Sequence, residues 1–132
     1  IAAIDEASLI IGICLLTLGN FFGGIWANES WGRYWGWDSK ETWSYVSILV
    51  YAIVLHLRLI PRLNSLYVFL TTSVFAYASI VMTYFGVNFY LTGMHSYAGG
   101  DQPQMSNLVY LALGFVLLAT ALAFKGRNVK TI

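Results

Sequence analysis

Four long apolar segments constrain the fold of this chain more than any other feature of its sequence. They predict membrane-spanning helices at about residues 7–26, 41–59, 66–91 and 106–124, each near the roughly 20 residues that a helix needs to cross a bilayer. The third segment contains no charged side chain. Charged residues make up only 10% of the whole chain, against about 25% in soluble domains. The sequence therefore predicts an all-α integral membrane protein.

Several features limit the other classes to which the chain could belong. The chain begins with Ile1, and no charged region or cleavage site precedes an apolar core. We therefore expect a C-terminal fragment of a larger helical bundle, in contact with membrane lipid. There is no basic run of the kind that binds nucleic acid. The single cysteine, Cys14, can form neither an intrachain disulfide nor a Cys-x-x-Cys site.

The basic residues predict how the spans are oriented. Arg58 and Arg62 lie between the second and third spans, and further basic residues follow the fourth. The positive-inside rule places both regions in the cytoplasm. The segment between the first two spans and the loop of residues 92–105 then face the other side of the membrane.

All five tryptophans of the chain fall within residues 26–43, which we name the tryptophan segment. Tryptophan concentrates at membrane interfaces because its ring is apolar and its N–H group seeks water, so an interfacial aromatic belt is the simplest interpretation. If the segment is helical, Trp31 and Trp35 would stack on one face, with Gly32 and Gly36 beside them. A large planar ring could then approach the backbone closely.

The start of the second span has a capping signal. Asp38 suits the N-cap position of a helix, and Glu41, three residues later, completes a capping box. Ser39 would then be the first helical residue. The sequence therefore predicts that a helix begins within the tryptophan segment.

The order of residues in this segment resembles a known signature. Trp-Gly-x-x-Trp-x-Trp-Asp-x-Lys-Glu-Thr-Trp, at residues 31–43, is similar to the WWD motif of the haem-handling proteins of cytochrome c biogenesis. Its Lys-Glu-Thr-Trp ending looks most like the System II cytochrome c synthetase branch (CcsA or the fused CcsBA). Ser39 stands where that family usually has proline, a mild departure because proline is favoured but not required at a first helical position. Residues 86–97 resemble the family segment that contains an external haem-ligating histidine.

The resemblance implies two positions for haem b. At the outer position, His95 would bind the haem iron. Without the resemblance, His95 would be interpreted as a solvated loop histidine. Residues of the tryptophan segment would form the haem platform on the extracytoplasmic side: Trp26, Trp31, Tyr34, Trp35, Trp37, Asp38 and Trp43. At the inner, intramembrane position, the resemblance implies that His56 binds iron. The simpler alternative is a neutral His56 hydrogen-bonded to a neighbouring helix.

The two histidines cannot serve one iron. His56 lies about 20 Å farther along the predicted helix than Trp43, at a rise of 1.5 Å per residue. If both histidines are ligands, each haem lacks a second axial ligand in this chain. The missing ligands are expected from the upstream part of the same polypeptide or from a CcsB-type partner.

The function that the resemblance implies is that of a cytochrome c synthetase, or haem lyase. It would deliver haem across the membrane and attach it, through thioether bonds, to the Cys-x-x-Cys-His segment of apocytochrome c. The chain has no evident acid or base for this step, so its role would be positioning. The expected location is the bacterial inner membrane with a periplasmic active face, or a thylakoid membrane.

The sequence is also compatible with two other functions. One is a haem-transfer protein that loads a separate haem chaperone, against which the Lys-Glu-Thr-Trp ending argues. The other is a structural or transport subunit without haem, whose aromatic belt only mimics the motif. The second alternative predicts that no haem binds.

Overall fold

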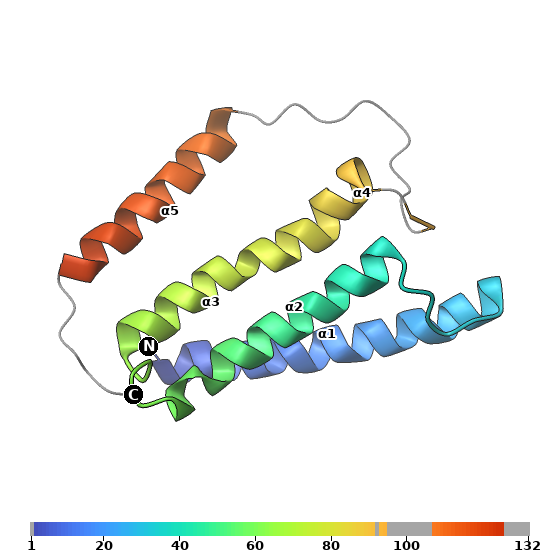
Figure 1. The fold of residues 1–132 in the computed structure, drawn as a ribbon, viewed down its shortest axis with the longest axis horizontal. Helices are drawn as coiled ribbons and strands as arrows, with labels where there is room; N and C mark the ends of the chain where they lie inside the picture. The colour runs from blue at the N-terminus through green and yellow to red at the C-terminus, as the bar shows by residue number, and fades with distance from the viewer. Residues whose placement is uncertain (1, 92, 95–106, 126–132) are drawn as a thin grey trace.

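The computed structural model describes residues 2–91, 93–94 and 107–125, and within them the regular elements are helical (Figure 1). Four stretches are long and apolar enough to cross a membrane: Ala2–Trp31, Ser39–Leu59, Leu66–Tyr90 and Asn107–Lys125. The predicted all-α membrane architecture is thereby confirmed. The elements in chain order are α1 (Ala2–Trp31), α2 (Ser39–His56), the 3₁₀ turn η1 (Leu57–Leu59), α3 (Leu66–Val81), the π-helical turn η2 (Met82–Gly86), α4 (Val87–Tyr90) and α5 (Asn107–Lys125).

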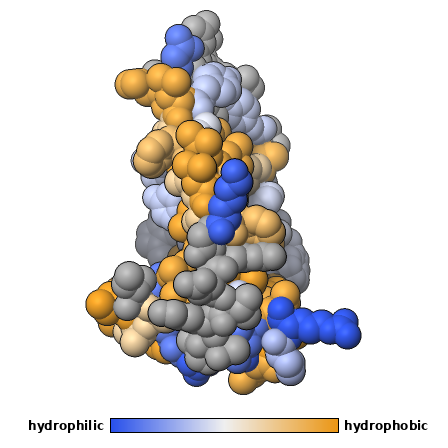
Figure 2. Space-filling view, turned by 90° about the vertical axis from the view of Figure 1, so that its left-hand side faces the viewer, coloured by the Kyte–Doolittle hydropathy of each residue, from blue (hydrophilic) through white to orange (hydrophobic). Residues whose placement is uncertain are grey.

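Helix α2 lies at the centre of the described bundle, packed against both α1 and α3 (Figure 1). A small core forms where Val54 of α2 meets Phe69 and Ala76 of α3, and Leu9 of α1 packs against it. Many other large apolar side chains are exposed, and apolar residues cover much of the face drawn in Figure 2. Lipid or other membrane helices are the surroundings that such a surface requires.

Helix α5 contacts the bundle near one of its ends. The Tyr67 hydroxyl of α3 donates to the carbonyl of Thr120 at 3.0 Å. The Tyr67 ring also meets the ring of Phe124 edge to face, with centroids 5.7 Å apart. The other end of α5 diverges from α3 (Figure 1).

The tryptophan segment is not one continuous helix. Helix α1 continues through Trp31 and ends at Gly32, whose φ is +71° and whose N–H donates to the Asn28 carbonyl at 2.8 Å. Glycine adopts this left-handed conformation without a steric penalty, so it is the usual residue at such a helix end. The chain is then irregular until α2 begins at Ser39. The helical stacking considered for Trp31 and Trp35 is therefore wrong.

The predicted start of α2 is confirmed. Asp38 is the N-cap in extended conformation, and its carboxylate accepts from the Lys40 N–H at 3.3 Å. The Glu41 carboxylate accepts from the Asp38 N–H at 3.2 Å, which completes the capping box. Four N–H groups of a helix start lack intrahelical partners, and this arrangement satisfies part of that need.

The third span contains a π-helical turn that the sequence pattern did not indicate. Within it, the Thr83 hydroxyl lies 3.0 Å from the hydroxyl of Ser47 and 3.1 Å from the carbonyl of Trp43. Ser47 is fully buried, so these bonds satisfy polar groups between α2 and η2. Single π turns inside helices recur at functional sites. Here the turn fastens the third span to α2 just below the tryptophan segment.

Candidate functional site

After the end of α1, the tryptophan segment folds back against that helix. A Cβ atom at Gly24 would lie 3.1 Å from the carbonyl oxygen of Tyr34, so the glycine permits the close approach of this backbone. Near the end of α1, the rings of Trp26 and Trp31 meet edge to face with centroids 5.0 Å apart. The aromatic residues on both sides of the turn are thereby gathered at one end of the bundle.

The aromatic side chains of this end divide into supporting and exposed groups. Trp35 is half-buried and meets Tyr45 of α2 and Trp37 edge to face, at centroid distances of 6.3 and 5.6 Å. Trp26, Tyr34 and Trp37 are 50%, 63% and 70% exposed. The exposed rings offer an apolar surface that a planar ligand could cover.

Trp37 has an unusual backbone conformation, with a φ of +55°. The N–H groups on either side of it, those of Gly36 and Asp38, both donate to Oε2 of Glu41, at 2.7 and 3.2 Å. The hydroxyl of Thr42 donates to the Trp37 carbonyl at 3.2 Å. The first turn of α2 therefore bonds to the main-chain amides on both sides of Trp37 and to the carbonyl of Trp37 itself.

Asp38 joins the tryptophan segment to the residues that immediately precede His95. Its Oδ1 accepts from the Met94 N–H at 2.6 Å, and a Cβ atom at Gly93 would lie only 2.6 Å from the same oxygen. The Arg33 guanidinium donates to the Met94 sulfur at 2.7 Å. His95 and the rest of the predicted outer loop lie outside the described residues, so its ligand role stays a prediction.

A second link connects the tryptophan segment to the third span. The Lys40 ammonium donates to the side-chain oxygen of Asn88, on α4, at 3.4 Å. The partners in this bond are 48 positions apart in the sequence, and those in the Arg33–Met94 bond are 61 apart. No local sequence pattern predicts contacts over such separations, so sequence reasoning missed the roles of Asn88 and Met94.

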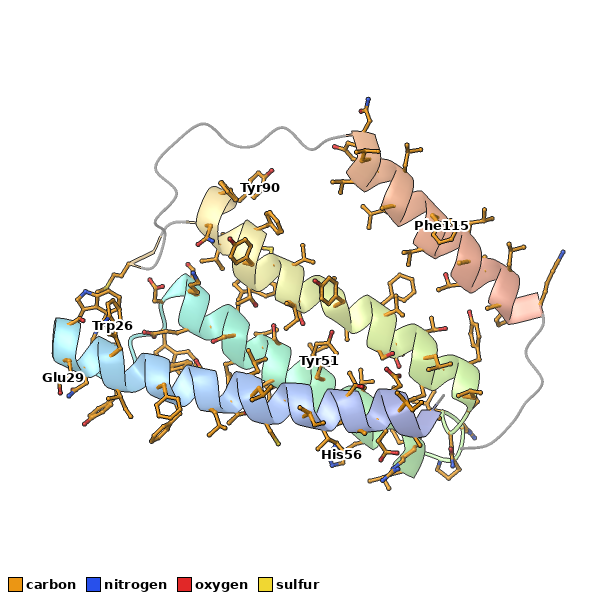
Figure 3. The ribbon with its side chains drawn as sticks, turned by 180° about the vertical axis from the view of Figure 1, so that it is seen from behind. Trp26, Glu29, Tyr51, His56, Tyr90 and Phe115 are labelled. Atoms are coloured by element: carbon orange, nitrogen blue, oxygen red, sulfur yellow. The ribbon has the colours of Figure 1, made fainter. Side chains whose placement is uncertain are left out.

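His56 lies at the other end of α2, where it is the last residue of the helix. Figure 3 shows it far from Trp26 and Glu29, which mark the tryptophan end. The ring is exposed, and its Nδ1 lies 2.7 Å from the carbonyl of Ala52. Since a carbonyl can only accept, Nδ1 must hold the proton, and in the neutral ring Nε2 presents a lone pair. That tautomer suits iron coordination through Nε2.

A cavity of about 350 Å³ lies between α1 and the tryptophan segment. Gly19 and Gly23 contribute to one wall, and Tyr34 and Trp35 to another. Its polar lining groups are Asn20, Lys40, Glu41, Ser44 and Thr83. Ser44 donates to the Asn20 side chain at 3.0 Å, a bond that ties α2 to α1 beside the cavity.

The donor set limits the chemistry of the site. Within the described parts of the chain, no group of three or more His, Cys, Asp or Glu residues is placed to hold a metal ion. Exposed aromatic rings lie at one end of the bundle and an exposed imidazole at the other, so each end offers one of the two kinds of group, ring contact and axial nitrogen, that hold a metalloporphyrin.

Comparison with known proteins identifies the family. Residues 1–95 match the family described as Cytochrome C assembly protein. The chain is 63% identical to NrfI of Wolinella succinogenes over 101 residues, 76% of this chain and 11% of that protein. It is 43% identical to the cytochrome c biogenesis protein CcsA of Cuscuta reflexa over 97 residues, 74% of this chain and 30% of that protein. To CcsA of Prochlorococcus marinus strain MIT 9301 it is 44% identical over 90 residues, 68% of this chain and 29% of that protein.

The chain thus spans less than a third of the length of these relatives. The match covers α1 to α4 and the whole tryptophan segment, where the resemblance to cytochrome c biogenesis proteins was found. Four described helices are able to span a membrane. The chain is therefore a multi-pass membrane protein that belongs to the cytochrome c assembly family.

Proposed function

We propose that this chain is the part of a System II cytochrome c synthetase that receives haem within the membrane and holds it for covalent attachment to apocytochrome c. Family membership supports a role in cytochrome c biogenesis. The observation that carries the proposal is the Asp38–Met94 hydrogen bond. It fastens Met94, which directly precedes His95 in the sequence, to the residue that follows the exposed Trp37.

The outer haem position is formed by the tryptophan segment. Haem, here the substrate, lies against the exposed rings of Trp26, Tyr34 and Trp37, and His95 supplies one axial ligand. The half-buried Trp31 and Trp35 contact the rings of Trp26 and Trp37 edge to face, and Trp43 in the first turn of α2 is half-buried as well. This surface faces the periplasm, or the lumen in a thylakoid membrane.

The inner haem position includes His56. Its Nε2 is available because Nδ1 bonds to the Ala52 carbonyl, and an axial ligand whose other nitrogen is fixed in this way keeps its tautomer and orientation. The ring is exposed on the described bundle, so haem can reach it from outside α2. The upstream part of the protein, or a CcsB-type partner, supplies the second ligand for each haem.

The reaction at the outer position forms two thioether bonds. Each cysteine thiol of the Cys-x-x-Cys-His segment adds across one haem vinyl group, with sulfur joining one carbon and hydrogen the other. No electrons are exchanged in this addition. The contribution of the chain is to hold the haem edge and the thiols in register, which can lower a barrier without an acid or base from the protein.

The test is haem spectroscopy on the purified full-length protein, comparing wild type with His95→Ala and His56→Ala. Each substitution should remove or shift one part of the haem absorption, and added imidazole should restore it. Cells that also express an apocytochrome c should lose covalent haem staining of that protein with either substitution. A wild-type protein that neither copurifies with haem nor binds it on addition would establish the haem-free alternative. Haem binding without covalent attachment, but with transfer to a chaperone, would establish that the protein is a haem-transfer protein.

A further inference from the structure

The backbone at Trp37 requires an explanation beyond the interfacial preference of tryptophan. Among the described residues other than glycine, Trp37 has the one positive φ, +55°. A bulky side chain rarely adopts this left-handed conformation, because its Cβ approaches the following carbonyl too closely. Such a conformation persists when surrounding contacts determine it more strongly than the local preference does. The indole that it directs is 70% exposed, so burial of the ring does not stabilise it.

The contacts that determine this conformation come from the first turn of α2. Oε2 of Glu41 accepts from the N–H of Gly36 at 2.7 Å and from the N–H of Asp38 at 3.2 Å, the amides on the two sides of Trp37. The hydroxyl of Thr42 donates to the Trp37 carbonyl at 3.2 Å. An ordinary capping box accounts for the bond to Asp38 alone. The bonds to Gly36 and Trp37 go beyond what the start of a helix needs.

We propose that Glu41 and Thr42 are positioning residues, which hold Trp37 in its left-handed conformation and present its exposed indole as a pre-formed contact for haem. The effect on haem binding rests on the proposed haem platform, whereas the bonds that hold Trp37 do not depend on it. A side chain that is ordered before the ligand arrives loses less conformational entropy on binding. Glu41 and Thr42 therefore fix the backbone that presents the Trp37 ring, without themselves contacting the haem.

The first measurement concerns the protein without haem. Full-length protein labelled with 5-fluorotryptophan gives one ¹⁹F resonance for each tryptophan, and the spectrum of Trp37→Phe assigns the resonance of Trp37. In Glu41→Ala and Thr42→Val this resonance should shift or broaden. Ser65→Ala is a matched control, because Ser65 caps α3 through the Val68 N–H at 3.2 Å and makes no described contact with Trp37. It should leave the Trp37 resonance in place.

The second measurement is haem affinity of the same variants, determined by titration. We expect a roughly tenfold loss for Glu41→Ala, which removes two hydrogen bonds, and roughly threefold for Thr42→Val, which removes one. Glu41→Gln should restore most of the affinity, since an amide oxygen can accept the same two N–H groups. Ser65→Ala should bind haem as wild type does.

The outcomes separate the inference from the proposed function. If the Trp37 resonance is unchanged in both Glu41→Ala and Thr42→Val, the positioning role is overturned, whatever haem does. If the resonance moves but haem affinity stays at the wild-type value, the consequence for haem binding is overturned. Equal losses of affinity in Glu41→Gln and Glu41→Ala would overturn it also, in favour of a role for the carboxylate charge. If wild type binds no haem, the proposed function fails, and the resonance of Trp37 still decides the positioning role.

Discussion

At the tryptophan end of the bundle, the carboxylates of Asp38 and Glu41 accept from main-chain amides, whereas at the His56 end the described bonds of the Asp5 and Glu6 carboxylates go to side chains. Asp38 and Glu41 between them accept from the backbone amides of Gly36, Lys40 and Met94, among others. At the opposite end, Arg58 pairs with Glu6, and Ser73 donates to Asp5 at 3.1 Å. These bonds join α1 to η1 and to the first half of α3.

The difference bears on how each end can handle a ligand. Bonds to the main chain fix the path of the backbone, so the tryptophan end is held in one shape. Pairs of long, partly exposed side chains can exchange partners at little cost, because solvent or a ligand group can replace either member. We therefore expect the tryptophan end to act as a preformed surface and the His56 end to adjust when haem binds.

Among the substitutions that test this contrast, Asp38→Ala is expected to change the stability of the protein most. The free energy of unfolding of the full-length protein should fall by about 2 kcal/mol, the upper end of the range for a lost N-cap, because the Met94 amide also loses its acceptor. Reversible unfolding in mixed micelles measures the loss, and hydrogen exchange of residues 33–38 locates it. Asp38→Asn keeps one acceptor oxygen and should lose about half as much. Equal losses would show that the charge, and not the number of acceptors, fastens this end.

The second effect uses a matched pair of glycines on α1. Gly24→Ala should destabilise the protein by about 1 kcal/mol, the lower end of the cost of overpacking, because its Cβ would crowd the Tyr34 carbonyl. Gly23→Ala should stabilise it by up to about 1 kcal/mol, since a Cβ there meets nothing within 4 Å and alanine favours the helix. Unfolding in mixed micelles should give opposite signs. Stabilisation by Gly24→Ala would contradict the close approach of the tryptophan segment to α1.

A smaller effect is expected at the other end. Glu6→Gln removes the ion pair with Arg58 and should cost only about 0.5 kcal/mol, as is typical of partly exposed pairs. A double-mutant cycle with Arg58→Gln isolates the pairwise free energy. A coupling as large as the loss from Asp38→Ala would remove the difference between the two ends.

The smallest effect on stability is expected from His56→Ala. The ring is exposed and its described bond goes to a carbonyl of its own helix, so the free energy of unfolding should change by less than about 0.5 kcal/mol. Thermal denaturation of the haem-free protein measures this change. A loss of several kcal/mol would assign His56 a structural role and weaken the proposal that it binds iron.

Local sequence signals predicted much of this protein. The four spans follow from apolar runs of membrane length, and the start of α2 follows from Asp38 and Glu41 three residues apart. Both are properties of contiguous residues, whose physical causes are burial in lipid and the unsatisfied amides of a helix start. The family, too, was evident from the order of residues in the tryptophan segment.

The same sequence left the shape of the tryptophan segment open. Its four-residue spacing is compatible with a helix, but the left-handed Gly32 ends α1 and the chain reverses there. Spacing cannot reveal this, because a glycine inside a helical pattern can either be tolerated within the helix or end it. His95, the residue that the sequence most clearly assigns to iron, lies outside the described residues and remains a prediction.

What the sequence by itself determined is therefore the presence of four membrane-length apolar helices, the helix start at Asp38 and the family. Only the tertiary structure decided that Asp38 bonds to Met94, that Arg33 reaches its sulfur and that Lys40 reaches Asn88. These contacts join residues far apart in the chain, and they depend on how α2 and the third span pack. Helix propensity and hydropathy act over a few neighbouring residues, whereas the site is assembled by packing between spans.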